Sequence, residues 1–269
     1  MNYKDKAIDI REDALRMICS AKSGHSGGSL SCVEMLIALY YGTMKIDPKN
    51  PAAEDRDRFI MSKGHSCPPL YAILSDLGYF PREELWTLRK IDSPLQGHPD
   101  MHKVPGIDMN SGSLGQGCSC AMGMALAAKH LGKSYKVYTM VGDGECQEGI
   151  IWETAMAAAH YKLDNFTVLL DHNGLQIDGT NEQVMSLGDV CEKFSAFGFD
   201  CVSVDGHDTE ALIRALHRPS VGKPRFIDCC TVKGKGVSFM ENQVGWHGRP
   251  PKEDELKLAI EELEMKRHE

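Results

Sequence analysis

Three acidic side chains lie in the glycine-rich segment VGDGECQEG, which follows a run of apolar residues. Glycine-rich loops that follow a strand usually cradle phosphate, so the charges of Asp143, Glu145 and Glu148 conflict with that use. The segment also departs from both common phosphate-loop patterns. A dinucleotide fingerprint needs its third glycine two residues before Gly149, and a P-loop needs a lysine and a hydroxyl where two isoleucines stand.

A divalent cation between the loop and a diphosphate would remove this conflict. Mg2+ takes oxygen ligands and is often held by one or two carboxylates together with substrate phosphates. Asp143 offers a carboxylate, Asn173 an amide oxygen and Leu175 a backbone carbonyl. The backbone N–H groups around Gly142 and Gly144 would then face the diphosphate. The alternative interpretation is structural: Gly-Asp-Gly is a tight turn and Asn173 a turn former.

Four histidines are also candidates for chemistry. His25, His65 and His98 each follow a glycine, in SGHSGG, SKGHS and QGHPD, and His247 lies in GWHGRP. A lone loop histidine is most often solvated, and no paired cysteines accompany these four, so zinc is not indicated. As a group they suit proton transfer near neutral pH, where imidazole both donates and accepts.

The elements that position these residues follow from hydrophobic periodicity. Helices are expected over 5–21, 31–41, 68–77, 82–90, 118–130, 149–161, 208–216 and 252–266. Buried apolar runs predict strands over 57–61, 135–141, 165–171, 200–206 and 225–232. Their alternation predicts an α/β fold, with one parallel sheet covered by helices on both faces, as a single domain over 1–269. Asp143 and Asn173 then lie at carboxyl ends of strands, where such sheets bind ligands.

Composition narrows the class of protein. The 269 residues are 42% hydrophobic and 25% charged, with a net charge of -8, and no Lys/Arg-rich run occurs. Neither nucleic acid nor a membrane is therefore an expected partner. The N-terminus lacks the apolar core of a signal peptide. The ten cysteines form no C-x-x-C pair, so we expect reduced thiols and a cytoplasmic location.

Six segments resemble motifs of transketolases and occur in the order seen in that family. They are SGHSGG, SKGHS, QGHPD, GSLGQG, GDGECQEG and DHNGLQIDG. The last two resemble the thiamine diphosphate motif, which begins with Gly-Asp-Gly and ends about thirty residues later at an asparagine. His172 replaces the first asparagine of many versions. The resemblance covers about residues 10 to 250. It implies the diphosphate-binding fold of these enzymes, with thiamine diphosphate and Mg2+ as cofactors, metal ligands Asp143, Asn173 and Leu175, and a magnesium-dependent transferase of pentose phosphate type.

The resemblance also assigns roles to the histidines. His25, His65 and His98 would line the substrate channel over the thiazolium, where a carbanion attacks a ketose carbonyl. His65 would also contact the cofactor. His247 aligns with the second of two histidines that the family carries here, and the first falls near Val244. We expect His247 to serve in both catalysis and cofactor binding.

Further roles fall on two loops. By resemblance, Gly112, Ser113 and Leu114 form a cofactor-contacting loop, in which proline more often stands at the middle position. Gly142, Asp143, Gly144 and Asn173 would also bind the cofactor. Glu148 could simply offset a helix dipole; by resemblance it joins a carboxylate network that links two cofactor sites across a subunit interface, and it counts with the catalytic residues.

The resemblance covers only the N-terminal, diphosphate-binding portion of a transketolase. The glutamate that activates the cofactor's aminopyrimidine lies in the pyrimidine-binding domain of these enzymes. We therefore expect a second transketolase subunit that carries the pyrimidine-binding and C-terminal domains, a heterotetramer, and no activity from this chain alone. Together they would pass a two-carbon ketol unit between sugar phosphates. Two alternatives stay open: a related thiamine enzyme such as a deoxyxylulose-phosphate synthase, and a non-catalytic scaffold.

Overall fold

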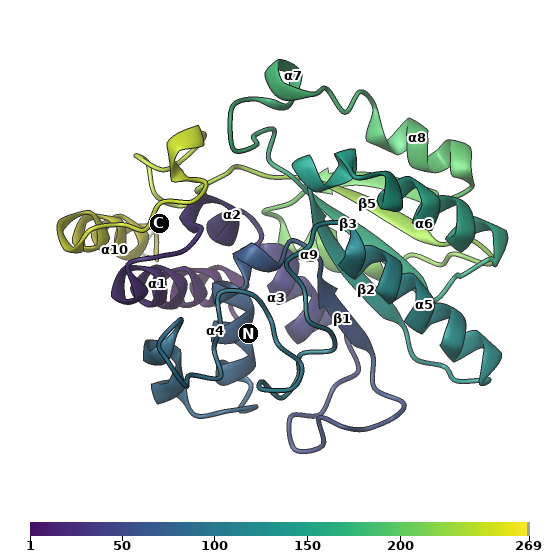
Figure 1. Cartoon of the computed structure of the whole chain (residues 1–269), viewed down its shortest axis with the longest axis horizontal. Coiled ribbons are helices and arrows are strands. Elements are labelled where there is room, and N and C mark those ends of the chain that lie inside the picture. Colours follow the sequence, from purple (N-terminus) through teal and green to yellow (C-terminus); the bar gives the residue numbers. More distant parts are fainter. Residues whose placement is uncertain (268–269) are drawn as a thin grey trace.

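The computed structural model describes residues 1–267 and contains a five-stranded sheet in which every strand is parallel to its neighbours (Figure 1). The strand order is β1-β2-β3-β5-β4. The strands are β1 (Arg58–Met61), β2 (Val137–Gly142), β3 (Phe166–His172), β4 (Asp200–Asp205) and β5 (Arg225–Cys230). The predicted α/β fold with an all-parallel sheet is therefore confirmed.

Helices cover both faces of the sheet, and the sheet separates two hydrophobic cores. Side chains alternate along the strands, so Tyr138 and Met140 of β2 pack into one core while Val137 and Val141 pack into the other. The first core contains α3 (Val33–Gly42), α4 (Pro68–Asp76) and α9 (Thr209–His217). The second contains α5 (Gln116–His130), α6 (Gly149–His160) and α8 (Val190–Phe197). This two-sided burial explains the continuous apolar runs of the central strands.

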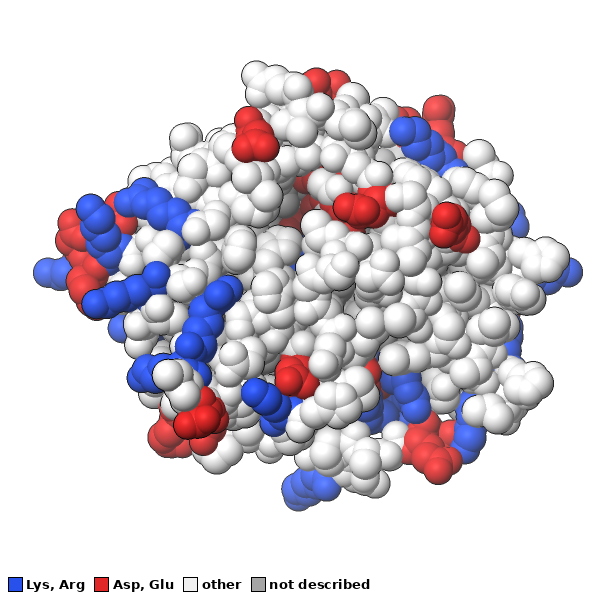
Figure 2. All heavy atoms as spheres, viewed as in Figure 1, with Lys and Arg blue, Asp and Glu red and all other residues white. Residues whose placement is uncertain are grey.

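The first helix of the chain contributes Ala7, Ile10 and Met17 to the first core and Ile8 and Leu15 to a third, smaller core. The helix α1 (Tyr3–Ala21) packs against α3, α4 and α10 (Glu253–Arg267), so the first and last helices lie side by side (Figure 1). Asn2 caps α1 by accepting the backbone N–H groups of Lys4 and Asp5. On the face shown in Figure 2, charged side chains gather mainly toward the rim, and most of the middle is uncharged.

Three local predictions differ from the structure. The SGHSGGS segment contains a short helix, α2 (Ser26–Ser31), rather than only a break. Residues expected to form a helix over 82–90 form a 3-10 segment, η2 (Arg82–Thr87). The helix α8 was not predicted, although Asp189 caps its start and Gly198 ends it in the left-handed region.

The remaining short elements lie mostly in the loops at the carboxyl edge of the sheet. They are η1 (Gly64–Ser66), η3 (Gly144–Gln147), α7 (Asn181–Val184) and η4 (Val244–Trp246). Three of them contain or adjoin predicted site residues: His65 lies in η1, Asp143 and Gly144 begin η3, and His247 follows η4. These loops therefore help to determine the geometry of the site. Within residues 1–267, none of the helices combines the length and apolar character that a membrane span requires.

Candidate active site

A cavity of about 440 Å³ opens at the carboxyl edge of the sheet. The residues predicted from the sequence line it, with the exceptions of Ser113 and Glu148. Ser113 is exposed, whereas its neighbours Gly112 and Leu114 face the cavity. The cavity therefore brings together segments that are far apart in the sequence.

Asp143 stands at the carboxyl end of β2 and is buried. Its Oδ2 accepts the backbone N–H groups of Asn173, at 3.0 Å, and Gly174, at 2.9 Å. Its Oδ1 is buried and accepts no hydrogen bond from the described residues. Burial, with a smaller contribution from the charge of Asp171, raises the pKa of Asp143 to about 6 against the opposing effect of His172. A buried carboxylate oxygen without a donor is the arrangement that a bound cation would satisfy.

The other two predicted metal ligands line the same cavity as this carboxylate. The side-chain oxygen of Asn173 accepts the backbone N–H of Leu175 at 3.2 Å, which folds the turn after β3. The carbonyl oxygen of Leu175 lies 3.3 Å from the ammonium nitrogen of Lys233. One carboxylate, one amide and one carbonyl form an all-oxygen donor set that suits a hard divalent cation. The residues present therefore fit Mg2+.

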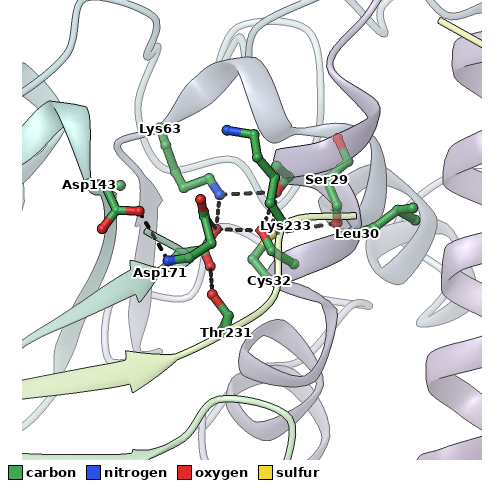
Figure 3. A network of polar contacts seen from close by, with 12 residues as sticks. Ser29, Leu30, Cys32, Lys63, Asp143, Asp171, Thr231 and Lys233 are labelled. Carbon is green, nitrogen blue, oxygen red and sulfur yellow. Dashed lines mark hydrogen bonds and ion pairs between the residues drawn. The ribbon is translucent and has the colours of Figure 1, made fainter. Parts of the chain in front are cut away.

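A second carboxylate, Asp171, organises the same strand end and was missed in the sequence (Figure 3). It is fully buried, and the Ser31 hydroxyl donates to it at 2.6 Å. Lys63 and Thr231 also donate to it. Burial alone would raise the pKa of Asp171, but the Lys63 ammonium outweighs it and lowers the pKa. Asp171 therefore remains ionised and joins α2, the loop after β1 and the end of β5 to β3.

The acid Glu145 also has a structural role that the sequence did not reveal. Its carboxylate accepts the Ser62 hydroxyl, the Gly115 N–H at 2.8 Å and the Gly142 N–H at 3.1 Å. Ser62 follows β1, Gly115 precedes α5 and Gly142 ends β2. One buried carboxylate thus holds three cofactor-side loops together, which we call the Glu145 clamp.

The third acid of the loop, Glu148, faces solvent. It occupies the N-cap position of α6, without a side-chain capping hydrogen bond, and does not line the cavity. The three acids therefore differ in environment: Asp143 presents a free oxygen, Glu145 joins loops and Glu148 is exposed. The interface role of Glu148 stays a prediction.

Three of the four histidines form a cluster of rings in the cavity. The ring centroid of His25 lies 4.9 Å from that of His65 and 5.5 Å from that of His247. His65 and His247 stack, with centroids 5.4 Å apart. Burial, with a smaller effect of Arg89, lowers the pKa of His25 to about 4. Burial, with Lys233, lowers the pKa of His247 to about 3. The cluster is therefore neutral near pH 7.

The fourth histidine, His98, lines the same cavity against the glycine of the GSLGQG region. A Cβ on Gly112 would come within 3.0 Å of the His98 ring, and Gly112 has a φ of +144°. Only glycine suits both requirements. Burial lowers the pKa of His98, and Arg89 adds to the effect. The cofactor-contacting loop predicted from the sequence therefore lies directly against a predicted channel histidine.

Lys233 connects the histidine cluster to the predicted metal ligands and was also missed. Its ammonium lies 2.9 Å from Nδ1 of His247 and 3.3 Å from the carbonyl oxygen of Leu175. Burial, together with repulsion from Lys63, lowers the pKa of Lys233 to about 8. An incompletely neutralised cation in this position can attract a diphosphate. The sequence did contain one indication of this residue: a lysine stands in the segment TVKGKG, directly after the last predicted strand.

Comparisons with known proteins agree with this geometry. Residues 3–269 match the family described as transketolase, thiamine diphosphate binding domain. The chain is 45% identical over 266 residues to a 6-deoxy-6-sulfo-D-fructose transketolase subunit of Clostridium sp. (strain MSTE9), covering 98% of this chain and 97% of that one. It is 43% identical over 255 residues to an apulose-4-phosphate transketolase subunit of Phocaeicola vulgatus, covering 94% and 90%.

Solved structures show the same relationship. Transketolase from Leishmania mexicana superposes with a TM-score of 0.93 at 31% identity, covering 98% of this chain and 41% of that chain. Transketolase from Campylobacter jejuni gives 0.93 at 34% identity, covering 98% and 43%. The chain thus spans about two fifths of these solved transketolases. With its family match and its fold, the chain belongs to the transketolase family, and the part of that family that it matches is the thiamine diphosphate-binding domain.

Proposed function

We propose that this chain, with a second transketolase subunit, transfers a two-carbon ketol unit from a ketose phosphate to an aldose phosphate. The observation that carries the proposal is the position of Lys233, whose ammonium contacts both the Leu175 carbonyl and His247. Lys233 therefore lies between the oxygen atoms proposed to bind Mg2+ and a cluster of neutral histidines in the same cavity. Cofactor binding and proton handling can therefore take place side by side.

In this proposal Asp143, Asn173 and Leu175 hold Mg2+ through their oxygens. The backbone N–H groups around Gly142 and Gly144 face the diphosphate. Further cofactor contacts come from the side chains of Lys233, His65 and His247 and from the Gly112, Ser113 and Leu114 loop. When bound, thiamine diphosphate supplies a nucleophilic thiazolium carbon for attack on the ketose carbonyl.

The histidines transfer protons to and from the oxygen atoms of the sugar. A neutral imidazole can accept a proton at one ring nitrogen and donate at the other. Because burial lowers the pKa values of His25 and His98, both are neutral near pH 7 and can accept from a sugar hydroxyl. The proton comes from the sugar hydroxyl whose oxygen becomes the aldehyde carbonyl when the carbon–carbon bond breaks. It is donated to the carbonyl oxygen of the acceptor sugar, which gains negative charge when that sugar is attacked.

The partner is proposed from the names of relatives, several of which are called subunits. We propose that it carries the pyrimidine-binding and C-terminal domains, that this chain is a single domain, and that two copies of each form a heterotetramer. Glu148 would lie at the interface between the two halves. All ten cysteines lie within the described residues and are free thiols, which fits a reducing cytoplasm.

The test is a ketol-transfer assay of the purified chain with Mg2+ and thiamine diphosphate, with and without the partner subunit. Donor sugars would include 6-deoxy-6-sulfofructose and apulose 4-phosphate, because the names of two relatives mention them, and pentose phosphates. We expect activity only with both subunits. Full activity of this chain alone would refute the split-enzyme proposal, and the absence of Mg2+-dependent cofactor binding to the assembly would favour a scaffold.

A further inference from the structure

The segment from Thr231 to Gly234 carries two side chains that reach the site, but it lies beyond the end of β5 and outside the sheet. Three of its backbone N–H groups are held by three different parts of the molecule. Thr231 donates to the carbonyl of His172 at 3.0 Å, and Gly234 donates to the carbonyl of Gly27 at 3.0 Å. The N–H of Val232 instead donates to a side chain.

That side chain is His207, whose Nε2 accepts the Val232 N–H at 2.9 Å. Its other nitrogen, Nδ1, lies 3.0 Å from a carboxylate oxygen of Glu34. Because Nε2 accepts, the ring proton must sit on Nδ1 and be donated to Glu34. The two partners therefore fix the tautomer and the orientation of the His207 ring.

Glu34 is in turn held rigidly. Arg11 donates to its two oxygens, at 2.6 Å and 2.7 Å, and also to the carbonyl of Leu30 at 3.0 Å. Burial alone would raise the pKa of Glu34, but Arg11 and His207 outweigh it and lower the pKa to about 2. Arg11 and Glu34 are both buried. His207 is thus anchored to a buried, charged pair between α1 and α3.

We propose that His207 is a positioning residue that places the ammonium of Lys233 for the diphosphate, acting through the backbone of Val232. This inference rests on the proposed function, in which Lys233 contacts the diphosphate. His207 does not line the cavity. Arg11 and Glu34 hold the His207 ring in place, and the ring in turn holds the Val232 peptide. The effect therefore reaches Lys233 through the backbone of the preceding residue.

The geometry of Lys233 explains why such support is needed. The lysine stem is intrinsically flexible and its ammonium is a single point charge, so the ammonium has a fixed position only where the stem is confined and its backbone is held. The stem passes close to Gly27, where a Cβ would lie 3.0 Å from Cγ of Lys233. With the stem confined in this way, a shift of the Val232 peptide moves the ammonium directly. Binding groups must be held within about 0.5 Å of their productive position.

The first experiment measures thiamine diphosphate affinity by calorimetry of the assembled enzyme with Mg2+. We expect His207→Phe to weaken binding about 10-fold and Lys233→Met to weaken it at least as much, which corresponds to about 1.4 kcal/mol or more. The double variant should bind no more weakly than Lys233→Met. His207→Gln, which keeps one acceptor and one donor, should stay within about twofold of the wild type. The matched control is His217→Phe, at an exposed histidine of α9.

The second experiment needs no cofactor and follows amide hydrogen exchange in the assembled enzyme. We expect the Val232 amide to exchange faster in His207→Phe while the β5 amides keep their protection. Unchanged Val232 exchange, or additive losses of affinity in the double variant, would overturn the inference. Wild-type affinity in Lys233→Met would instead refute the diphosphate role of Lys233, and with it the link from His207 to the cofactor.

Discussion

The ammonium of Lys233 lies 2.9 Å from Nδ1 of His247. A protonated lysine can only donate, so Nδ1 accepts and neutral His247 carries its proton on Nε2. Lys233 also helps burial to lower the pKa of His247 to about 3. We predict that Lys233→Met raises the pKa of His247 toward its ordinary value. The ring proton of neutral His247 should then no longer be confined to Nε2. Nitrogen-15 NMR of imidazole-labelled protein would measure both, and an unchanged His247 signal would contradict the assigned contact.

A substitution of Asp143 should separate binding from stability. Its pKa is raised to about 6 by burial, so at pH 7.5 the folded protein contains a carboxylate that burial disfavours. Asp143→Asn removes this charge and keeps an oxygen for the N–H groups of Asn173 and Gly174. We expect the free energy of unfolding to rise by on the order of 1 kcal/mol, while Mg2+-dependent cofactor binding is lost.

Urea denaturation and calorimetry would measure the two effects. The stability gain should disappear well below pH 6, because the wild-type carboxyl is then protonated as well. Asn173→Asp, which keeps an oxygen ligand, should weaken binding less than Asn173→Ala. Unchanged cofactor affinity in Asp143→Asn would exclude this residue as a metal ligand.

The channel histidines should affect turnover more than cofactor affinity. His25→Ala and His98→Ala are expected to lower kcat about 100- to 10,000-fold, the usual contribution of a well-placed acid or base. The reason is that both are proposed to act on sugar oxygens. Steady-state kinetics at saturating thiamine diphosphate would measure the effect. Poor cofactor binding combined with normal turnover at saturation would show that the assignment is wrong.

Acid should destabilise the protein through the same histidines. The folded pKa values of His25 and His247 are about 4 and about 3, below their unfolded value of about 6.5. Their contribution to stability is therefore complete above about pH 6.5 and is lost as pH falls through that range toward the folded values. Urea denaturation of the cofactor-free chain from pH 7 to pH 4 should show this loss. His25→Gln should make it smaller, and the exposed His130→Gln should leave it unchanged.

The Glu145 clamp can be tested against an acid of the same loop. Glu145→Gln loses one acceptor and faces the Gly142 N–H with its own amide donor, so we expect a loss of about 1–3 kcal/mol in the free energy of unfolding and weaker cofactor binding. The matched control, Glu148→Gln, changes an exposed acid and should stay within about 0.5 kcal/mol. Equal stability of the two variants would contradict the clamp.

The sequence could predict the part of the site that local rules determine. In a parallel sheet the ends of neighbouring strands meet, so Asp143 and Asn173 could be paired from their positions after two apolar runs. The histidines and the Gly112 region could be placed only through the ordered motifs of a known family. The strands were foreseen because burial on both faces leaves a continuous apolar run.

The missed residues depend on contacts that local patterns do not contain. Asp171 lies inside a run expected to be an apolar strand. Its role depends on its contact with Lys63, which is 108 residues away in the sequence. Glu145 looked like a loop acid because two of its three donors, on Ser62 and Gly115, come from distant segments of the chain. Lys233 could not be assigned to the site from the sequence, because only the fold brings its ammonium to His247. A charged residue at the end of a buried strand was a local signal in the case of Asp171, since such residues are rarely buried without partners.

Asp171 also has a consequence for how the protein folds. Its contacts with Ser31, Lys63 and Thr231 span 140, 108 and 60 residues of chain. Contacts that close such long loops form slowly, because the entropy of loop closure is lost before the contact is gained. We therefore expect the strand end that carries Asn173 to be completed late, after the segments with Ser31, Lys63 and Thr231 have reached β3. In the assembled enzyme, we expect cofactor binding to recover during refolding only after these contacts have formed.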